Sequence, residues 1–173
     1  RPDWVSSAAF WYQTPPVAGE EPLPPATNRV APYRVLAAKN LTCRAEPAAK
    51  LKLEDEGLTY EPGKPEARIE FDFDVAESGR YQISAVLIMS LSSSRYQPVL
   101  DGRPVGPELD LCVLEEDWTW FSLDLHDLAA GKHTLKFIGR GASPHQRTMA
   151  PPRFAFGLNS LVLLRLEDLT APK

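Results

Sequence analysis

The segment from Ala67 to Val75 alternates strictly between apolar and polar residues. Ile69, Phe71, Phe73 and Val75 fall on one side of this alternation, and charged residues occupy the positions between them. Successive side chains of a β-strand point to opposite faces, so a period of two predicts a strand with one buried face. A chain that contains such a strand has to pack its apolar face against a second layer.

Further strand-sized segments follow along the chain, with turn residues between them. Tyr81 to Leu91 is apolar on both faces, which predicts a central strand in a two-layer packing. Asp101-Gly102 is a hairpin-type turn. Many short strands without a βαβ alternation predict an all-β domain, a β-sandwich or jelly roll. The other predicted strands are Tyr96–Leu100, Trp118–Leu125, His133–Gly139 and Leu158–Leu166, with short helical turns at Pro32–Ala38 and Leu125–Ala130.

The N-terminal part of the chain differs in composition from the rest. Six of the seventeen prolines lie between Gln13 and Pro32. Because proline fixes φ and lacks an N–H donor, this stretch predicts an extended strap instead of a helix or central strand. Val5–Tyr12, before it, is expected to be a strand that pairs with a sheet of this chain or another. We therefore predict a strand plus proline-rich strap in residues 1–32 and a β-sandwich domain in residues 33–173.

Charge and residue usage exclude several classes of partner. The formal net charge is −4 and the pI is about 5.4, so we expect no nucleic-acid partner. No apolar stretch is long enough for a membrane span, and we expect no membrane contact. The spacing of Cys43 and Cys112 argues against a zinc site, and either a disulfide or two free thiols fits it. We expect no cofactor and no metal site, with a structural calcium ion as the one exception left open.

The sequence carries no catalytic motif, such as a nucleophile elbow, a phosphate-binding loop or a metalloprotease helix. A glycosidase needs two facing carboxylates. With 23 acidic residues in the chain, such pairs are common by chance. We therefore predict no catalytic residue.

The densest acidic cluster, Glu115 to Asp117, directly precedes Trp118 and Trp120. It is either a solvated loop before a strand or part of a sugar site, because aromatic faces stack on sugar rings while carboxylates bind hydroxyls. The two tryptophans point to the same side of their strand. The periodicity favours Phe121, Leu123 and Leu125 as the buried face, which leaves the tryptophans outward, but a core position for them stays open.

Two loops are long enough to hold a binding site, Leu91–Arg95 and Gly139–Arg153. The second loop could equally be a disordered surface insertion. The ligand-binding residues that we predict from these loops and the tryptophan strand are Trp118, Trp120, Tyr96, Arg95, Glu116, Asp117, His145 and Arg147.

Two parts of the chain resemble known families. Ser6–Pro16, which contains Phe-Trp-Tyr-Gln, followed by Pro22–Pro25 and Asn28-Arg29, resembles the C-terminal edge of glycoside hydrolase family 172, formerly domain of unknown function 2961. That family contains difructose-anhydride-forming enzymes and fructo- or arabinofuranosidases. The resemblance covers about 30 residues. It implies that the catalytic carboxylates would lie upstream of Arg1.

The body of the chain is similar to the galactose-binding-like sandwiches, to which carbohydrate-binding-module families 6 and 35 belong. This resemblance is a fold-level pattern, and fold alone does not imply function. The segments that carry it are Phe71–Val75, Ser78–Tyr81, Val99–Gly102, Leu125–Leu135 and Leu158–Leu166.

Together the two resemblances imply a non-catalytic, secreted or periplasmic accessory sandwich of a carbohydrate-active enzyme. Such a module would bind glycan or stabilise an oligomer. The alternatives are a purely structural module that forms a homo-oligomer or contacts a preceding catalytic domain, and part of a family-172-like hydrolase whose catalytic residues lie upstream or on another chain. A free-standing hydrolase is the least favoured interpretation.

Overall fold

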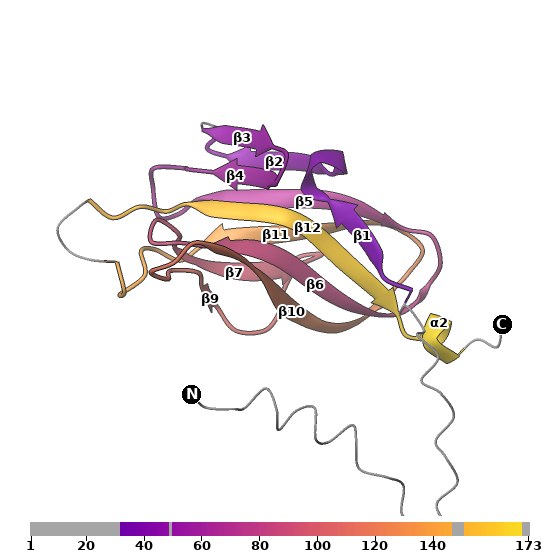
Figure 1. Ribbon diagram of the computed structural model, residues 1–173. Coiled ribbons are helices and arrows are strands. Elements are labelled where there is room, and N and C mark those ends of the chain that lie inside the picture. The colour runs from indigo at the N-terminus through magenta and orange to yellow at the C-terminus, as the bar shows by residue number, and fades with distance from the viewer. Residues whose placement is uncertain (1–31, 49, 147–150, 171–173) are drawn as a thin grey trace, which may run out of the picture. The chain divides into compact units, whose positions relative to one another are not determined.

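The computed structural model describes residues 32–48, 50–146 and 151–170, which form a two-layer arrangement of strands (Figure 1). A short 3₁₀ turn, η1 (Ala38–Asn40), follows the first strand, and a helical turn, α2 (Glu167–Thr170), follows the last. The strands are β1 (Arg34–Ala37), β2 (Thr42–Glu46), β3 (Leu51–Glu54), β4 (Gly57–Tyr60), β5 (Arg68–Val75), β6 (Gly79–Met89), β7 (Arg95–Leu100), β8 (Arg103–Pro104), β9 (Leu109–Asp110), β10 (Asp117–Leu128), β11 (Gly131–Gly139) and β12 (Phe156–Arg165).

Within the described residues these strands form two antiparallel sheets of six strands each. The first sheet has the order β10-β6-β12-β4-β3, and β1 pairs with β12 beside β4. The second has the order β2-β5-β11-β7-β8, and β9 pairs with β7. The predicted all-β sandwich is confirmed, and β6 is central in its sheet, as the apolar character of both its faces predicts.

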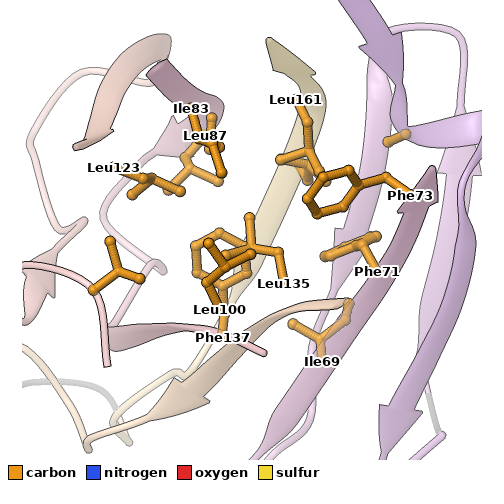
Figure 2. Close-up of a cluster of buried hydrophobic side chains, with 14 of the residues drawn as sticks. Ile69, Phe71, Phe73, Ile83, Leu87, Leu100, Leu123, Leu135, Phe137 and Leu161 are labelled. Carbon is orange, nitrogen blue, oxygen red and sulfur yellow. The ribbon is translucent and has the colours of Figure 1, made fainter. Parts of the chain in front are cut away.

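The core lies between the sheets and is richest in aromatic rings around Phe156. The centroid of its ring lies 4.7 Å from that of Phe137, 5.0 Å from that of Tyr96 and 6.4 Å from that of Phe71. The Tyr96 hydroxyl donates a hydrogen bond of 2.6 Å to the Phe154 carbonyl, which satisfies a polar group that would be costly to bury alone. Figure 2 shows part of this core, in which Ile83, Leu87, Leu123 and Leu161 of the first sheet face Phe71, Phe73, Leu135 and Phe137 of the second.

The structure corrects the predicted phase of the tryptophan strand. Leu123 is buried and Phe121 packs against the core, as predicted, but Leu125 is 45% exposed. The register between β10 and β6 shifts between Ser122 and Leu125, and Asp124 has a φ of 63° there. This bulge inserts an extra residue and reverses the alternation, so that Leu128 is the next fully buried side chain.

Three other local expectations are resolved. Arg34–Ala37 is a strand and not a helical turn, because it extends the sheet along β12. The predicted helical turn from Leu125 is also wrong, since β10 continues to Leu128. Cys43 and Cys112 are free thiols, so the disulfide alternative is not realised. The segment Val5–Tyr12 and the strap lie outside the described residues, apart from Pro32, and their predicted roles stay predictions.

The outer face of the second sheet carries a network of ion pairs on β2, β5 and β11. The Arg44 guanidinium donates to both oxygens of Asp72, at 2.6 and 2.9 Å, and to Glu70 at 2.7 Å. Thr134 donates to the same Asp72 carboxylate. The hydrogen bonds from Arg44 hold the pKa of Asp72 well below its ordinary value, although burial acts in the opposite direction.

We expect Asp72→Asn to destabilise the domain at about pH 7, and the gap to the wild type to narrow on acidification. A carboxyl whose folded-state pKa is lowered stabilises the fold fully above its unfolded-state value, near 3.8, and loses that contribution as the pH falls through the folded-state value. Urea unfolding from about pH 7 to about pH 2 measures this, with the exposed Glu66→Gln as control. A gap that does not change with pH would contradict the assignment.

Candidate functional site

The main groove on the described surface crosses the outer face of the first sheet. It encloses about 530 Å³. Its floor follows a row of residues that lie side by side on five strands: Trp118 pairs with Ile88, and Gly157 pairs with Thr59, which pairs with Lys52. We call these five residues the cross-strand row.

The middle of the row depends on the missing side chain of Gly157. A Cβ at this position would lie 2.7 Å from a side-chain carbon of Ile88, so the Ile88 side chain lies directly beside the Gly157 backbone. Any larger residue would displace Ile88 and raise the floor. The glycine therefore leaves room for the Ile88 side chain, which lines the groove between Trp118 and Lys52, whereas Gly157 itself does not line it.

Two loops that are hydrogen-bonded to each other lie along one side of the groove. The Gln146 amide donates to the carbonyls of Ser93, at 2.9 Å, and Arg153, at 2.7 Å, and its oxygen accepts from the Arg153 N–H. Ser92 accepts a backbone hydrogen bond from Ala155. These bonds hold Ser92 and Ser93 of the 91–95 loop against Gln146 and Ala155. Ser92 of the first loop and Arg153 of the second line the groove, so both loops contribute to it.

Charges of both signs line the groove. Lys50 and Lys52 lie at the β3 end, and Arg153 forms an ion pair with Glu61. Tyr60 lies beneath, fully buried, and burial raises the pKa of its hydroxyl to about 12, so it stays protonated and donates to the Pro47 carbonyl at 2.6 Å. The remaining charged residues of the groove are Glu54, Glu56 and Glu116.

A smaller groove of about 380 Å³ opens beside the first at the loop end. Leu91, Leu114 and Pro151 line it, and the two leucines are 49% and 72% exposed. It shares Ser90, Ser92, Glu116 and Arg153 with the main groove.

Three of the predicted ligand-binding residues lie at or beside the main groove. Trp118 is half-buried and lines it, and Glu116 lines both grooves. Asp117 is exposed next to them, and its carboxylate accepts a hydrogen bond of 2.8 Å from the backbone N–H of Trp118. Trp120 is also outward, with 58% of its surface exposed, but it does not line the groove; its ring packs edge-to-face against Tyr33 at 6.4 Å.

The other predicted residues have different surroundings. Tyr96 is completely buried in the aromatic core. Arg95 donates to the carbonyls of Arg140 and Ala142 and pairs with Glu108, which pins the start of the long loop. His145 is exposed, with its ring nitrogen 4.0 Å from Asp110. Arg147 lies outside the described residues.

The sequence patterns missed most of the β3–β4 side of the groove. Lys50, Lys52 and Thr59 come from a hairpin that we did not predict. Ile88 is predicted only as part of a strand, and Gly157 lies just before the predicted strand Leu158–Leu166. The signal for the hairpin was present, because Asp55-Glu56-Gly57 is a turn sequence between two short segments of alternating polarity.

Among the described residues, no group of three or more histidine, cysteine, aspartate or glutamate side chains is placed to hold a metal ion. In the same part of the chain, no helix has the length and apolar character needed to cross a membrane.

The comparison with known proteins identifies the fold. No family profile and no curated protein matches the sequence. A xanthan lyase from Paenibacillus is similar at 16% identity and a TM-score of 0.60, over 88% of this chain and 14% of that one. A GH26-CBM35 β-(1,4)-mannanase from Podospora anserina has 17% identity and a TM-score of 0.50, over 82% and 28% of the two chains.

A third similar structure is the C-terminal CBM6 of a marine laminarinase from Zobellia galactanivorans, with 14% identity and a TM-score of 0.47 over 77% of this chain and 99% of that one. The chain thus spans a small part of the first two proteins and nearly the whole of the third. At these identities the similarity shows the fold alone: the described part of this chain is a β-sandwich.

Proposed function

We propose that this chain is a non-catalytic, glycan-binding accessory module, and that the main groove is its binding site. The observation that carries the proposal is the half-buried Trp118 ring at the end of a groove whose other lining groups are mostly polar. A sugar ring has an apolar face and a rim of hydroxyls. An aromatic ring beside carboxylates, hydroxyls and amino groups matches both parts of it.

The electrostatics of the groove fit a neutral, hydroxyl-rich ligand. Carboxylates such as Glu54, Glu56 and Glu116 accept hydrogen bonds from hydroxyls, and Lys50 and Lys52 donate to them. An apolar peptide would have to desolvate these charges without replacing their hydrogen bonds, which is costly. The similar fold in carbohydrate-active proteins supports the same class of ligand.

A finer proposal concerns the protein to which the module belongs. The resemblance of residues 6–29 to the edge of glycoside hydrolase family 172 supports attachment to a catalytic domain of that kind, in a secreted or periplasmic protein. The catalytic residues would then lie upstream or on another chain. Residues 6–29 lie outside the described part of the chain, so this attachment stays a prediction. The expected absence of a cofactor, with a structural calcium ion left open, also stays a prediction.

Affinity electrophoresis with soluble polysaccharides tests the binding function. The panel contains fructan, arabinan, xylan, β-1,4-mannan, laminarin and xanthan. We expect retardation by at least one polysaccharide, and an affinity at least about tenfold weaker in Trp118→Ala, because truncating an aromatic side chain on which the ligand packs typically costs about 2 kcal/mol.

Trp120→Ala is the matched control for this experiment. It removes the same side chain from the same face of the same strand, but outside the groove. We expect it to bind as the wild type does. Equal losses in both variants would place the site elsewhere on the strand, and no retardation by any member of the panel would contradict glycan binding.

A second candidate function, assembly, is favoured by an apolar area on the same sheet. Tyr33, Val35 and Trp120 are each more than half exposed, although the rings of Tyr33 and Trp120 pack edge-to-face against each other. Val35 pairs with the buried Val162, so the area continues the apolar surface of the sheet. Exposed apolar patches of this kind often mark contacts between proteins.

If this area mediates assembly, the wild type forms a homo-oligomer whose mass rises with concentration, and Val35→Lys shifts it to the monomer because a charge cannot be buried there without a partner. Light scattering over a wide range of concentrations measures this, with Leu169→Lys as the control on an exposed leucine of α2. A wild type that stays monomeric throughout would remove this candidate.

A further inference from the structure

The direction and length of the main groove carry an inference about which part of a glycan it binds; the inference rests on the proposed binding function. The cross-strand row extends over β10, β6, β12, β4 and β3. With neighbouring strands about 4.8 Å apart, the row is about 19 Å long. A single sugar ring is much shorter than this distance.

Neither end of the row is closed by another strand. Trp118 lies on β10 and Lys52 on β3, and these are the two ends of the strand order in their sheet among the described residues. The residues beside the two ends, Asp117 and Glu54, are exposed. A site that recognises the end of a chain needs a wall against which the terminal sugar stops, and no strand among the described residues lies beyond either end of this row.

The binding chemistry is divided between the two ends. The aromatic surface of Trp118 lies at one edge of the sheet, and the amino groups of Lys50 and Lys52 lie at the other. Between them the Ile88 side chain over Gly157 gives a low apolar floor, followed by the Thr59 hydroxyl. One small ligand cannot contact both ends, so the full set of groups is used only by a ligand with several sugar units.

We propose that the groove binds an internal stretch of a linear glycan, which lies across the strands with successive sugars over β10, β6, β12, β4 and β3. Trp118 stacks on a sugar at one end of the stretch. Lys52 binds the hydroxyls of a sugar at the other end, and the sugars between them lie over Ile88 and Gly157. The reducing and non-reducing ends of the polysaccharide extend past the edges of the sheet and make no contact that binding requires.

Calorimetry with oligosaccharides of increasing length tests this proposal. The probes are the manno-, xylo-, laminari- and fructo-oligosaccharide series from di- to hexasaccharide. For each series that has a reducing end, the hexasaccharide is also tested after that end has been reduced to the alditol. In the series that binds, we expect Kd to fall at least about tenfold from the di- to the pentasaccharide and then to level off. Reduction of the end should change Kd of the hexasaccharide less than about twofold.

The variants Trp118→Ala and Lys52→Ala separate the two ends. Each should weaken hexasaccharide binding at least about fivefold. Lys52→Ala should leave disaccharide binding unchanged, because the disaccharide occupies the tryptophan end. The exposed Lys64→Ala, outside the groove, is the matched control, and circular dichroism with urea unfolding checks that each variant folds.

Two results would overturn the inference while leaving glycan binding intact. One is a disaccharide that binds as tightly as the hexasaccharide. The other is a hexasaccharide that loses its affinity when its end is reduced, since that result indicates recognition of the chain end. Failure of all oligosaccharides together with all polysaccharides of the electrophoresis panel would instead refute the proposed function itself.

Discussion

The packing of Phe156 between the two sheets is the interaction on which the rest of the structure depends. Its ring contacts those of Phe137, Tyr96 and Phe71, all of which lie on the opposite sheet. Because successive residues of a strand point to opposite faces, burying Phe156 directs Gly157 outward. The same contact that closes the core thus places a residue without a side chain beside Ile88, which lines the outer groove.

The hairpin of β3 and β4 reaches this groove only because of a second glycine. Gly57 has a φ of +146°, and a Cβ there would lie 2.6 Å from the Leu158 carbonyl oxygen. Close to this point the register between β12 and β6 shifts, and the Asn159 amide donates to the Glu56 carbonyl at 2.6 Å. The close approach brings Thr59 and Lys52 into line with Gly157, so the second half of the groove depends on this backbone contact.

The sequence predicts the sandwich because the pattern of apolar residues in its long strands shows directly which faces are buried. The alternation of Ile69, Phe71 and Phe73 and the apolar character of β6 need no tertiary information. The bulge at Asp124 could not be predicted in this way, since it follows from pairing with β6, and it is the reason that Leu125 is exposed. The periodicity favours an outward Trp118 but leaves a core position open, and whether the side chain lines a groove depends on loops and a hairpin distant in the sequence.

An NMR titration with an oligosaccharide tests most directly the central claim, that the main groove on the outer face of the first sheet is the binding site. The protein, labelled with ¹⁵N, is titrated with mannohexaose, xylohexaose, laminarihexaose or an inulin-type fructan hexasaccharide. The account predicts saturable shifts of the backbone amides of Trp118, Ile88, Gly157, Thr59 and Lys52 and of the Trp118 indole N–H. Saturable shifts confined to the second sheet, or to Tyr33 and Trp120, would contradict it.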